Sequence, residues 1–273
     1  MKFTFLGTSS CEGMPALFCN CPRCVAAREL GGKNIRTRAQ ALIDDELLLD
    51  FPPDTLYHFH QNGIEGHKIK YLLFTHSHAD HFCPRELGNR GVKRSEEMAA
   101  DVLHVYCTKG AIDKFSVVKY QKDFVQIHAI KPYDVFTLGN YRITALPAKH
   151  HPGDEAVNYL IEDGDKTLFY GLDTGYLYDE VFDYLEKKGV VLDMAVYDCS
   201  GVDREIGKDA FHMGIPEVRC VMARLRELGV VTEGTKQYVS HFSHYGHALQ
   251  ADVEETVKDD GLLVAFDGCT VEV

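Results

Sequence analysis

The segment FTHSHADHF, residues 74–82, places three histidines and one aspartate within six positions. It follows directly on IKYLLFT, residues 69–75, an apolar run whose length suits a strand buried on both faces. A solvated polar loop is the competing interpretation, and it would be favoured for any one of these histidines alone. The four residues together favour a metal site, because burying so many titratable groups without a cation would be costly.

The composition indicates an ordinary globular protein. The chain has 273 residues, of which 45% are hydrophobic, and its formal net charge is −12. No apolar run is long enough to predict a membrane span, and the N-terminus lacks the layout of a signal peptide, so we expect a cytoplasmic protein. Nine cysteines in such a chain predict thiols and metal ligands rather than disulfides. The negative charge argues against an extended nucleic-acid or membrane surface.

The order of predicted elements indicates an α/β protein. Alternating or continuous apolar residues predict strands at 1–7, 102–108 and 141–148, two strands within 39–51 joined at Asp44-Asp45, and a hairpin that turns at Asp163-Gly164. Apolar residues at three- and four-residue spacing, followed by glycine, predict helices over 54–63, 179–189 and 215–229. Because no linker or repeat interrupts this order, we expect a single domain over 1–273, an αββα four-layer sandwich of two mixed sheets flanked by helices.

The H-x-H-x-D-H pattern of residues 76–81 resembles the signature of the metallo-β-lactamase fold. The resemblance implies three further ligands, each just after a later strand. LPAKHH offers His150, FYGLDTGY offers Asp173 and YVSHFSH offers His241. His151 competes with His150 for the ligand role, and we favour His150 because it comes first after the strand.

This assignment predicts a dinuclear centre in which Asp173 bridges two divalent metals. Three ligands serve each metal: His76, His78 and His150 hold one, and Asp80, His81 and His241 hold the other. A hydroxide at the bridging position would attack the substrate, with Asp80 and Asp173 essential to catalysis. Nitrogen and oxygen ligands suit zinc, manganese or iron about equally.

A second group of candidate ligands lies in FCNCPRC, residues 18–24. Cys19, Cys21 and Cys24 have the spacing of a zinc-knuckle loop, at 19–24, that lacks one ligand. Free buried thiols or a redox motif are the alternatives. His244 is the candidate fourth ligand of this structural zinc, and His247 is the alternative.

Together these motifs closely resemble the phosphoribosyl cyclic phosphate phosphodiesterases of the carbon-phosphorus lyase pathway. The likeness includes FLGTSS at 5–10, GLDTG at 171–175, VYDCS at 196–200 and VAFDG at 264–268. The resemblance implies a phosphodiesterase that opens a small, cyclic phosphodiester. It also implies manganese in the active site, zinc in the cysteine site, and a homodimer.

Two further residues acquire roles from the resemblance. His212 in KDAFHMGI matches a histidine that contacts the phosphate and assists the leaving oxygen, a role that suits an imidazole titrating near neutrality. Asp50 matches an aspartate that orients the ligands without binding metal. A histidine at a helix start with no role, and a turn-forming aspartate, are the competing interpretations.

Residues 83–101, CPRELGNRGVKRSEEMAAD, form a longer connection than the resemblance leads us to expect. Four basic residues concentrate there in an acidic protein: Arg85, Arg90, Lys93 and Arg94. As a lid they could grip a substrate phosphate. A solvated surface is an equally good interpretation.

Other functions share parts of this pattern. A tRNA 3'-end endonuclease would need a basic arm, which the sequence does not offer. A β-lactamase or thioester hydrolase would share the core ligands, but we do not associate the cysteine knuckle or His212 with those families. The non-catalytic protein of pyrroloquinoline quinone biosynthesis resembles this chain in its cysteine site, yet it generally lacks the full histidine set.

Overall fold

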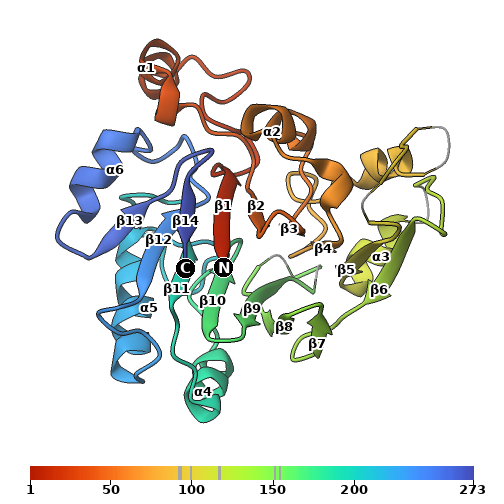
Figure 1. Ribbon diagram of the computed structural model, residues 1–273. Coiled ribbons are helices and arrows are strands. Elements are labelled where there is room, and N and C mark those ends of the chain that lie inside the picture. The colour runs from red at the N-terminus through yellow and green to blue at the C-terminus, as the bar shows by residue number, and fades with distance from the viewer. Residues whose placement is uncertain (92–93, 99, 116–117, 151, 154) are drawn as a thin grey trace.

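The computed structural model describes residues 1–273 except 92–93, 99, 116–117, 151 and 154. In the described ranges its strands form two seven-stranded sheets (Figure 1). The first sheet has the order β14 (Thr270–Glu272), β1 (Lys2–Gly7), β2 (Gln40–Ile43), β3 (Leu47–Leu49), β4 (Tyr71–Leu73), β5 (Leu103–Cys107) and β6 (Val125–Ala129). The second has the order β13 (Leu262–Val264), β12 (Lys236–Ser240), β11 (Met194–Asp198), β10 (Lys166–Gly171), β9 (Val157–Asp163), β8 (Tyr141–Pro147) and β7 (Val135–Leu138).

Both sheets are mixed. In the first, β3 to β6 pair in parallel while β1 runs antiparallel to β2 and β14. In the second, β10 to β13 pair in parallel and β7 to β10 pair antiparallel. Because neighbouring parallel strands end at the same edge of a sheet, the loops after β10, β11 and β12 can meet at one edge of the second sheet, and β4 ends in the same way in the first.

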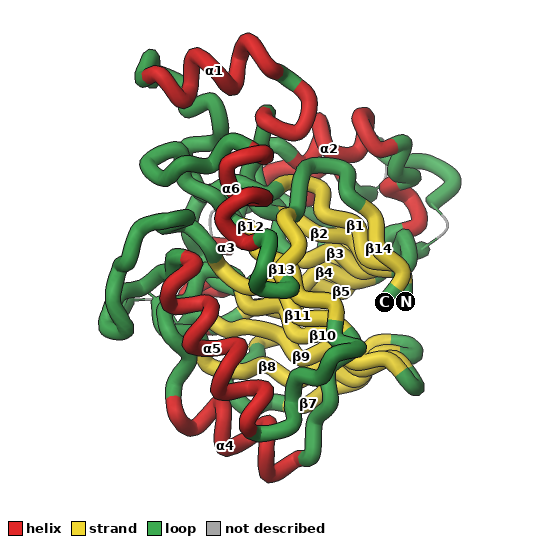
Figure 2. The backbone as a smooth tube through the Cα atoms, turned by 90° about the vertical axis from the view of Figure 1, so that its left-hand side faces the viewer, coloured by secondary structure: helices red, strands yellow, loops and turns green. Residues whose placement is uncertain are grey.

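Helices cover the outer face of each sheet (Figure 2). The helices are α1 (Pro22–Leu30), α2 (Thr55–Asn62), α3 (Lys109–Phe115), α4 (Asp179–Lys188), α5 (Ile215–Glu227) and α6 (Gln250–Val257), with short 3-10 turns at Gly32–Asn34, Gly66–Lys68 and Pro84–Asn89. Buried residues of α4, α5 and α6 share one apolar cluster with the second sheet, and those of α3 share another with the first. Within the described part of the chain, no helix has the length and apolar character needed to cross a membrane.

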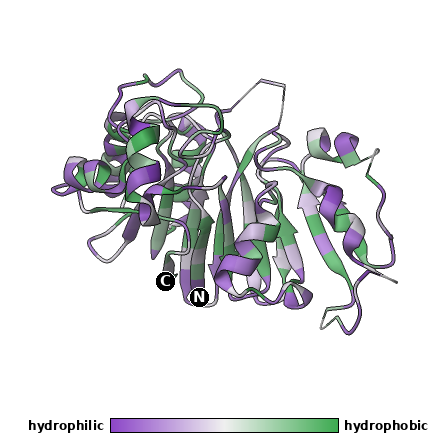
Figure 3. Ribbon diagram, turned by 90° about the horizontal axis from the view of Figure 1, so that it is seen from above, coloured by the Kyte–Doolittle hydropathy of each residue, from purple (hydrophilic) through white to green (hydrophobic). Residues whose placement is uncertain are grey.

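A third apolar cluster fills the space between the two sheets. It joins the inner faces of both, as Phe3 and Leu49 from the first and Tyr159 and Val196 from the second illustrate. In Figure 3 hydrophobic residues concentrate in the strands, whereas the helices also carry hydrophilic stretches. Three apolar layers separate four layers of secondary structure, so the predicted αββα sandwich is confirmed.

The local predictions need two corrections. Cys24, expected in a loop, lies in the first turn of α1, where Pro22 fits because the first helical N–H needs no partner. The strand expected over 69–75 is shorter, since β4 ends at Leu73. Thr75 directs its N–H to the Asp50 carboxylate, at 2.8 Å, instead of to a neighbouring strand.

Arg36 ties the N-terminal loop to the far end of the chain. Its guanidinium is buried and donates to the Thr8 hydroxyl at 2.9 Å, the Ala265 carbonyl at 2.7 Å and the Gln250 side-chain oxygen at 2.6 Å. It also lies 4.3 Å from the centre of the Phe242 ring. Arg36 therefore supports the segment that follows β12.

We expect Arg36→Met to lower the free energy of unfolding by roughly 2 to 4 kcal/mol, because buried acceptors on Ala265 and Gln250 would lose their donor. Urea titration followed by circular dichroism measures this. The control is Arg226→Met on the exposed side of α5, which should change stability by no more than about 0.5 kcal/mol. An equal decrease in the free energy of unfolding in both variants would contradict the proposal that Arg36 stabilises the segment after β12.

Candidate metal centre

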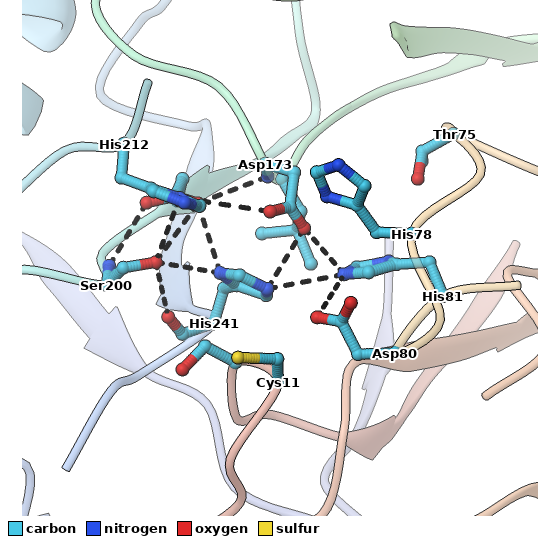
Figure 4. Close-up of polar contacts among 12 residues, drawn as sticks. Cys11, Thr75, His78, Asp80, His81, Asp173, Ser200, His212 and His241 are labelled. Carbon is cyan, nitrogen blue, oxygen red and sulfur yellow. Dashed lines mark hydrogen bonds and ion pairs between the residues drawn. The ribbon is translucent and has the colours of Figure 1, made fainter. Parts of the chain in front are cut away.

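The predicted ligands meet where strands of both sheets end. His76, His78, Asp80 and His81 follow β4, His150 follows β8, Asp173 follows β10 and His241 follows β12. Four groups in this region have ligand atoms within 4.8 Å of one another: His76, His78 and His150; Asp80, His81 and His241; His76, His81 and Asp173; and Asp173, Asp198, His212 and His241. In Figure 4 Asp173 lies between His81 and His212, with His241 and Asp80 below it. The structure thus brings together residues separated by up to 165 positions.

Asp50 fixes the tautomers of two histidines. The Thr75 hydroxyl lies 3.0 Å from both carboxylate oxygens of Asp50, so its hydrogen goes to the carboxylate. His76 Nδ1, 2.9 Å from the same hydroxyl, must then donate to it. His81 Nδ1 donates to Asp50 at 2.7 Å. Both imidazoles are left with Nε2 as the free ligand atom.

Asp198 plays the corresponding part on the second sheet. Its carboxylate lies 3.1 Å from His241 Nδ1, which leaves His241 Nε2 to face the centre. It also accepts hydrogen bonds from the backbone N–H of Asp173 at 3.1 Å, of Ser200 at 3.0 Å and of Met213 at 3.1 Å. A fully buried carboxylate therefore orients several groups at once.

The two oxygens of Asp173 face different histidines. One lies 3.5 Å from His150 Nε2, whose other nitrogen is 3.4 Å from the Phe211 carbonyl. The other lies 2.6 Å from His81 Nε2 and 3.0 Å from His241 Nε2. This arrangement suits a carboxylate shared between two cations.

Two observations show that the residues fit divalent cations. His76 Nε2 is buried without a hydrogen-bond partner in the described ranges, so a lone pair points into the cluster. His81 Nε2 and His241 Nε2 are only 3.3 Å apart, and in the neutral tautomers set by Asp50 and Asp198 both nitrogens would carry a lone pair. Lone pairs at this distance repel one another unless a positive charge lies between them.

The electrostatics point the same way. Burial by itself lowers the pKa of His241, but the charge of Asp173 and hydrogen bonds with carboxylates outweigh it and raise the pKa to about 10. The pKa of His81 is raised for the same reason against the same burial effect. Burial lowers the pKa of His76 well below its ordinary value. The site therefore attracts positive charge beside Asp173 and keeps His76 neutral.

Three of these residues have a left-handed backbone conformation, with φ of 64° at Asp50, 48° at Asp173 and 66° at His241. Such conformations are uncommon for residues other than glycine and carry strain. Asp50 and His241 directly follow a strand and Asp173 comes two residues after one, so each conformation turns the chain where the side chain enters the cluster. Packing of the two sheets holds these side chains in place.

His212 lies beside the cluster and opens onto a cavity. Its Nδ1 is 3.1 Å from Asp198 Oδ2 and 3.8 Å from Asp173 Oδ1, and its side chain is 34% exposed. Burial lowers the pKa of His212, but the charges of Asp198 and Asp173 and the hydrogen bond with Asp198 raise it above its ordinary value. The adjoining cavity, of about 590 Å³, is lined by Ser200, His212 and residues of three loops. Its size suits a small molecule.

The basic residues of 83–101 that the structure describes are not among the residues lining this cavity. Arg90, expected to face a phosphate, donates instead to the carbonyls of Phe124 and Ala100. Arg85 and Arg94 line a different cavity, of about 890 Å³, which Phe82 also lines. Pro84–Asn89 forms a 3-10 turn, with Leu87 packed in the apolar cluster of the first sheet. Lys93 and His151 lie outside the described residues.

The cysteine group assembles as a separate cluster. Cys19, Cys21, Cys24 and His244 have ligand atoms within 4.8 Å of one another. The backbone N–H of Cys21 points at Cys19 Sγ, at 3.4 Å. A backbone hydrogen bond and His244 lower the pKa of Cys21 to about 6, which favours the thiolate that zinc requires. His247, the alternative ligand, is 60% exposed and pairs with Asp203 at 2.5 Å.

Glu12 links the cysteine cluster to the metal centre. One of its carboxylate oxygens accepts hydrogen bonds from the Ser243 hydroxyl and the His244 N–H, and the other accepts one from the Ser10 hydroxyl at 2.9 Å. The segment from His241 to His244 thus contributes to both clusters. A disturbance of one cluster is expected to reach the other.

Asp198, Ser200 and Glu12 were missed by reasoning from the sequence. One signal was available for Asp198, because it ends β11 just as Asp173 follows the neighbouring parallel strand β10. The resemblance includes the residues VYDCS but implies no role for their aspartate. Ser200 and Glu12 carried no comparable signal.

Comparison with known proteins gives one family and several structural neighbours. The model of the family described as "Beta-lactamase superfamily domain" matches residues 47–242. Ribonuclease Z of Picosynechococcus sp. is 28% identical over 174 residues, which are 61% of this chain and 48% of that protein. The chain therefore spans about half the length of this curated relative.

Two solved structures superpose over the entire chain. A diphosphatase of the PhnP family has a TM-score of 0.75 at 21% identity, with 100% of this chain and 97% of the other covered. Zinc-bound PqqB from Methylobacterium extorquens has a TM-score of 0.74 at 19% identity, with 100% of both chains covered. At these identities the likeness shows the fold.

We expect Cys21→Ser to lower the zinc content of the purified protein by about one equivalent and to lower its melting temperature, because a closed structural site contributes to folding. Elemental analysis and differential scanning calorimetry measure both. Cys220→Ser, on the exposed face of α5, is the matched control. Unchanged zinc and melting temperature in Cys21→Ser would refute the knuckle.

We expect Asp198→Asn to weaken metal binding at the centre by about 10- to 100-fold, because His241 would lose the acceptor that fixes its tautomer. Competition with a chelator measures the affinity. Asp165→Ala in the β9–β10 turn is the control, since that residue is exposed. A folded Asp198→Asn protein with unaltered metal affinity would contradict the orienting role.

Proposed function

The chain belongs to the beta-lactamase superfamily, and from that premise we propose that it is a metal-dependent hydrolase of small phosphodiesters. The observation that carries the proposal is the position of His212, held by Asp198 at the boundary between the metal centre and a cavity. A binding protein would have no need of a titratable group oriented at that point. Hydrolysis uses such a group to protonate a leaving oxygen.

The metal assignment rests on the converging lone pairs. His76, His78 and His150 would hold one divalent cation, Asp80, His81 and His241 the other, and Asp173 both. Bound there, such cations would lower the pKa of a water molecule and neutralise charge on the phosphate. Nitrogen and oxygen ligands of this kind do not favour manganese, zinc or iron over the other two. The Cys19, Cys21, Cys24 and His244 cluster would hold a structural zinc.

His212 would act through one defined atom. Its Nδ1 faces Asp198 and Ser200, so Nε2 is the nitrogen that remains for substrate. The carboxylate of Asp198 favours the protonated imidazole, which can then release its proton to the departing alkoxide. Asp198 itself positions His212 and does not touch the substrate.

A cyclic phosphodiester is the substrate that we favour. The motif resemblance supports it, and a diphosphatase of the PhnP family shares the fold over the whole chain. The small cavity beside His212 suits a compact ester better than a polynucleotide, and so does the net charge of −12.

RNA cleavage is the second candidate, favoured by the match to ribonuclease Z. Both reactions break a phosphodiester bond, so RNA cleavage differs from the first candidate in the size of the substrate and not in the chemistry. Turnover of a precursor tRNA, with none of a small diester, would identify it. A single domain over 1–273, a homodimer and a cytoplasmic location stay predictions.

The test is hydrolysis of bis(p-nitrophenyl) phosphate and glycerol 1,2-cyclic phosphate by manganese-reconstituted protein, with a β-lactam alongside. We expect diester turnover, no β-lactam cleavage, and loss of activity in Asp173→Asn. His212→Ala should lower kcat about 100-fold on the cyclic substrate, whose alkoxide needs a proton, and much less with p-nitrophenolate as leaving group.

The control for this comparison is His60→Ala, an exposed histidine of α2. This variant removes an imidazole outside the metal centre, so it shows whether the effect of His212→Ala depends on the position of the lost side chain. Equal effects of His212→Ala on both substrates would refute the role as an acid. The absence of any diester turnover in protein that retains two metals would overturn the proposed function.

A further inference from the structure

The cavity of about 890 Å³ is lined by basic side chains. One wall is the segment that follows the metal-binding loop, with Arg85 and Arg94, and the other is the end of α3 and the chain after it, with Lys114 and Lys119. Neither aspartate nor glutamate occurs among the lining residues that the structure describes. In the whole chain acidic residues outnumber basic ones by 41 to 29, so the lining of this basic cavity departs from the composition of the protein.

The positive charges of the basic cavity lack carboxylate partners. Arg94 and Lys114 donate to neutral oxygens, of a side-chain amide and of a backbone carbonyl. Arg85 and Lys119 are exposed, and their side chains make no hydrogen bond or ion pair within the described ranges. Like charges gathered without a counter-charge repel one another, so an anion placed between them is stabilised.

The acidic residues nearest to these cations in the sequence face elsewhere. Glu86 and Glu96 line another cavity, of about 330 Å³. Asp113 forms an ion pair with Lys109 at 2.8 Å. None of these three carboxylates lines the basic cavity. The cations therefore face its interior without a counter-ion from the described part of the chain.

Two glycines allow the walls of the cavity to touch. A Cβ at Gly88 would lie 2.5 Å from the Lys119 carbonyl oxygen, and a Cβ at Gly91 would lie 2.7 Å from the Gln121 side chain. Gly91 also has a φ of 131°, which residues with a side chain rarely adopt. The two walls are thus in direct contact along their backbones. A site whose walls are already in place loses less entropy when a ligand binds.

The floor of the basic cavity belongs to the segment that carries four candidate metal ligands. Phe82, the last residue of FTHSHADHF, lines the cavity and packs against Phe74 and Phe115, with ring centres 4.7 and 5.0 Å away. Lys114 connects the α3 wall to the same segment, because its ammonium group donates to the Ser77 carbonyl. An occupant would therefore lie against the metal-binding segment. Yet the basic cavity shares none of its described lining residues with the cavity beside the metal centre.

We propose that the basic cavity binds a small anion that carries two or more phosphate groups, at a site separate from the metal centre. Guanidinium groups bind phosphate oxygens in pairs, and ammonium groups bind them as point charges. Two phosphate monoesters carry a charge of about −3 to −4 at neutral pH, which the four cations can neutralise. Phe82, Pro84 and Tyr120 complete the lining and leave space for the organic part of such a molecule. The proposal does not depend on the proposed function.

Calorimetric titration of the manganese-loaded protein with fructose 1,6-bisphosphate and with fructose 6-phosphate tests the site. Neither compound contains a phosphodiester bond. We expect the bisphosphate to bind at least about tenfold more tightly than the monophosphate, because the second phosphate adds charge-assisted hydrogen bonds. Arg85→Gln and Lys119→Gln should each weaken binding of the bisphosphate by about tenfold.

The matched controls are Arg226→Gln on α5 and Lys187→Gln on α4, which remove the same charges from exposed positions outside the cavity. Each should change the affinity for the bisphosphate by less than about twofold, because salt screens charges that lie far from the ligand. An equal decrease in the control and the cavity variants would overturn the proposal, since only the net charge of the protein would then matter. Equal affinities of the unmodified protein for the bisphosphate and the monophosphate would also overturn it.

Two further measurements separate this site from the metal centre. Folded Asp173→Asn protein should bind the bisphosphate as tightly as the unmodified protein does, and Lys119→Gln should hydrolyse bis(p-nitrophenyl) phosphate at the unmodified rate. Loss of bisphosphate binding in Asp173→Asn, with binding retained in Arg85→Gln and Lys119→Gln, would place the ligand at the metal centre and overturn the proposal.

A single-stranded oligoribonucleotide distinguishes a small ligand from a polymer. Binding of the oligoribonucleotide that weakens in Arg85→Gln and Lys119→Gln, with no binding of the bisphosphate, would show a surface for a polynucleotide and overturn the proposed ligand. Absence of diester turnover in the unmodified protein would overturn the proposed function alone, because the binding measurements do not require turnover.

Discussion

The structure depends on the compensation of buried negative charge where the two sheets end. Asp50, Asp173 and Asp198 are at most 3% exposed, and each would be prohibitively costly to bury as an isolated carboxylate. Hydrogen bonds from imidazoles, hydroxyls and backbone N–H groups offset part of this cost. The remaining charge, centred on Asp173, explains why neutral histidine nitrogens converge on it and why the site suits divalent cations.

Each sheet supplies one buried carboxylate that orients histidines of the metal centre. Asp50, which follows β3 in the first sheet, orients His76 through Thr75 and His81 directly, whereas Asp198 at the end of β11 in the second sheet orients His241 and His212. Neither sheet by itself contains a complete set of ligands. The apolar cluster between them therefore contributes to function, because it fixes the distance across which these groups meet.

The N-terminal loop adds a third support. Glu12 and Arg36 bind the segment after β12 from that loop, and His241 and His244 direct this segment toward two different clusters. The cysteine cluster thus stabilises the same backbone that positions a ligand of the metal centre. The loop after β11, fixed by Glu217, completes the cavity on the opposite side. The overall charge of −12 opposes long-range attraction of an anionic molecule.

The four-layer fold and most of the candidate ligands could be predicted without the structure, because H-x-H-x-D-H and C-x-C-x-x-C have spacings that local backbone geometry converts into clusters. Reasoning from a resemblance added Asp50, His150, Asp173, His212 and His241, which the structure then brings together. Only the tertiary structure revealed Asp198, Ser200 and Glu12, chose His244 over His247, and directed Arg90 away from the cavity. The reason is physical: a polar side chain acquires its role from the partner it meets, and these partners lie across the fold, as His81 and His241 do at a separation of 160 residues.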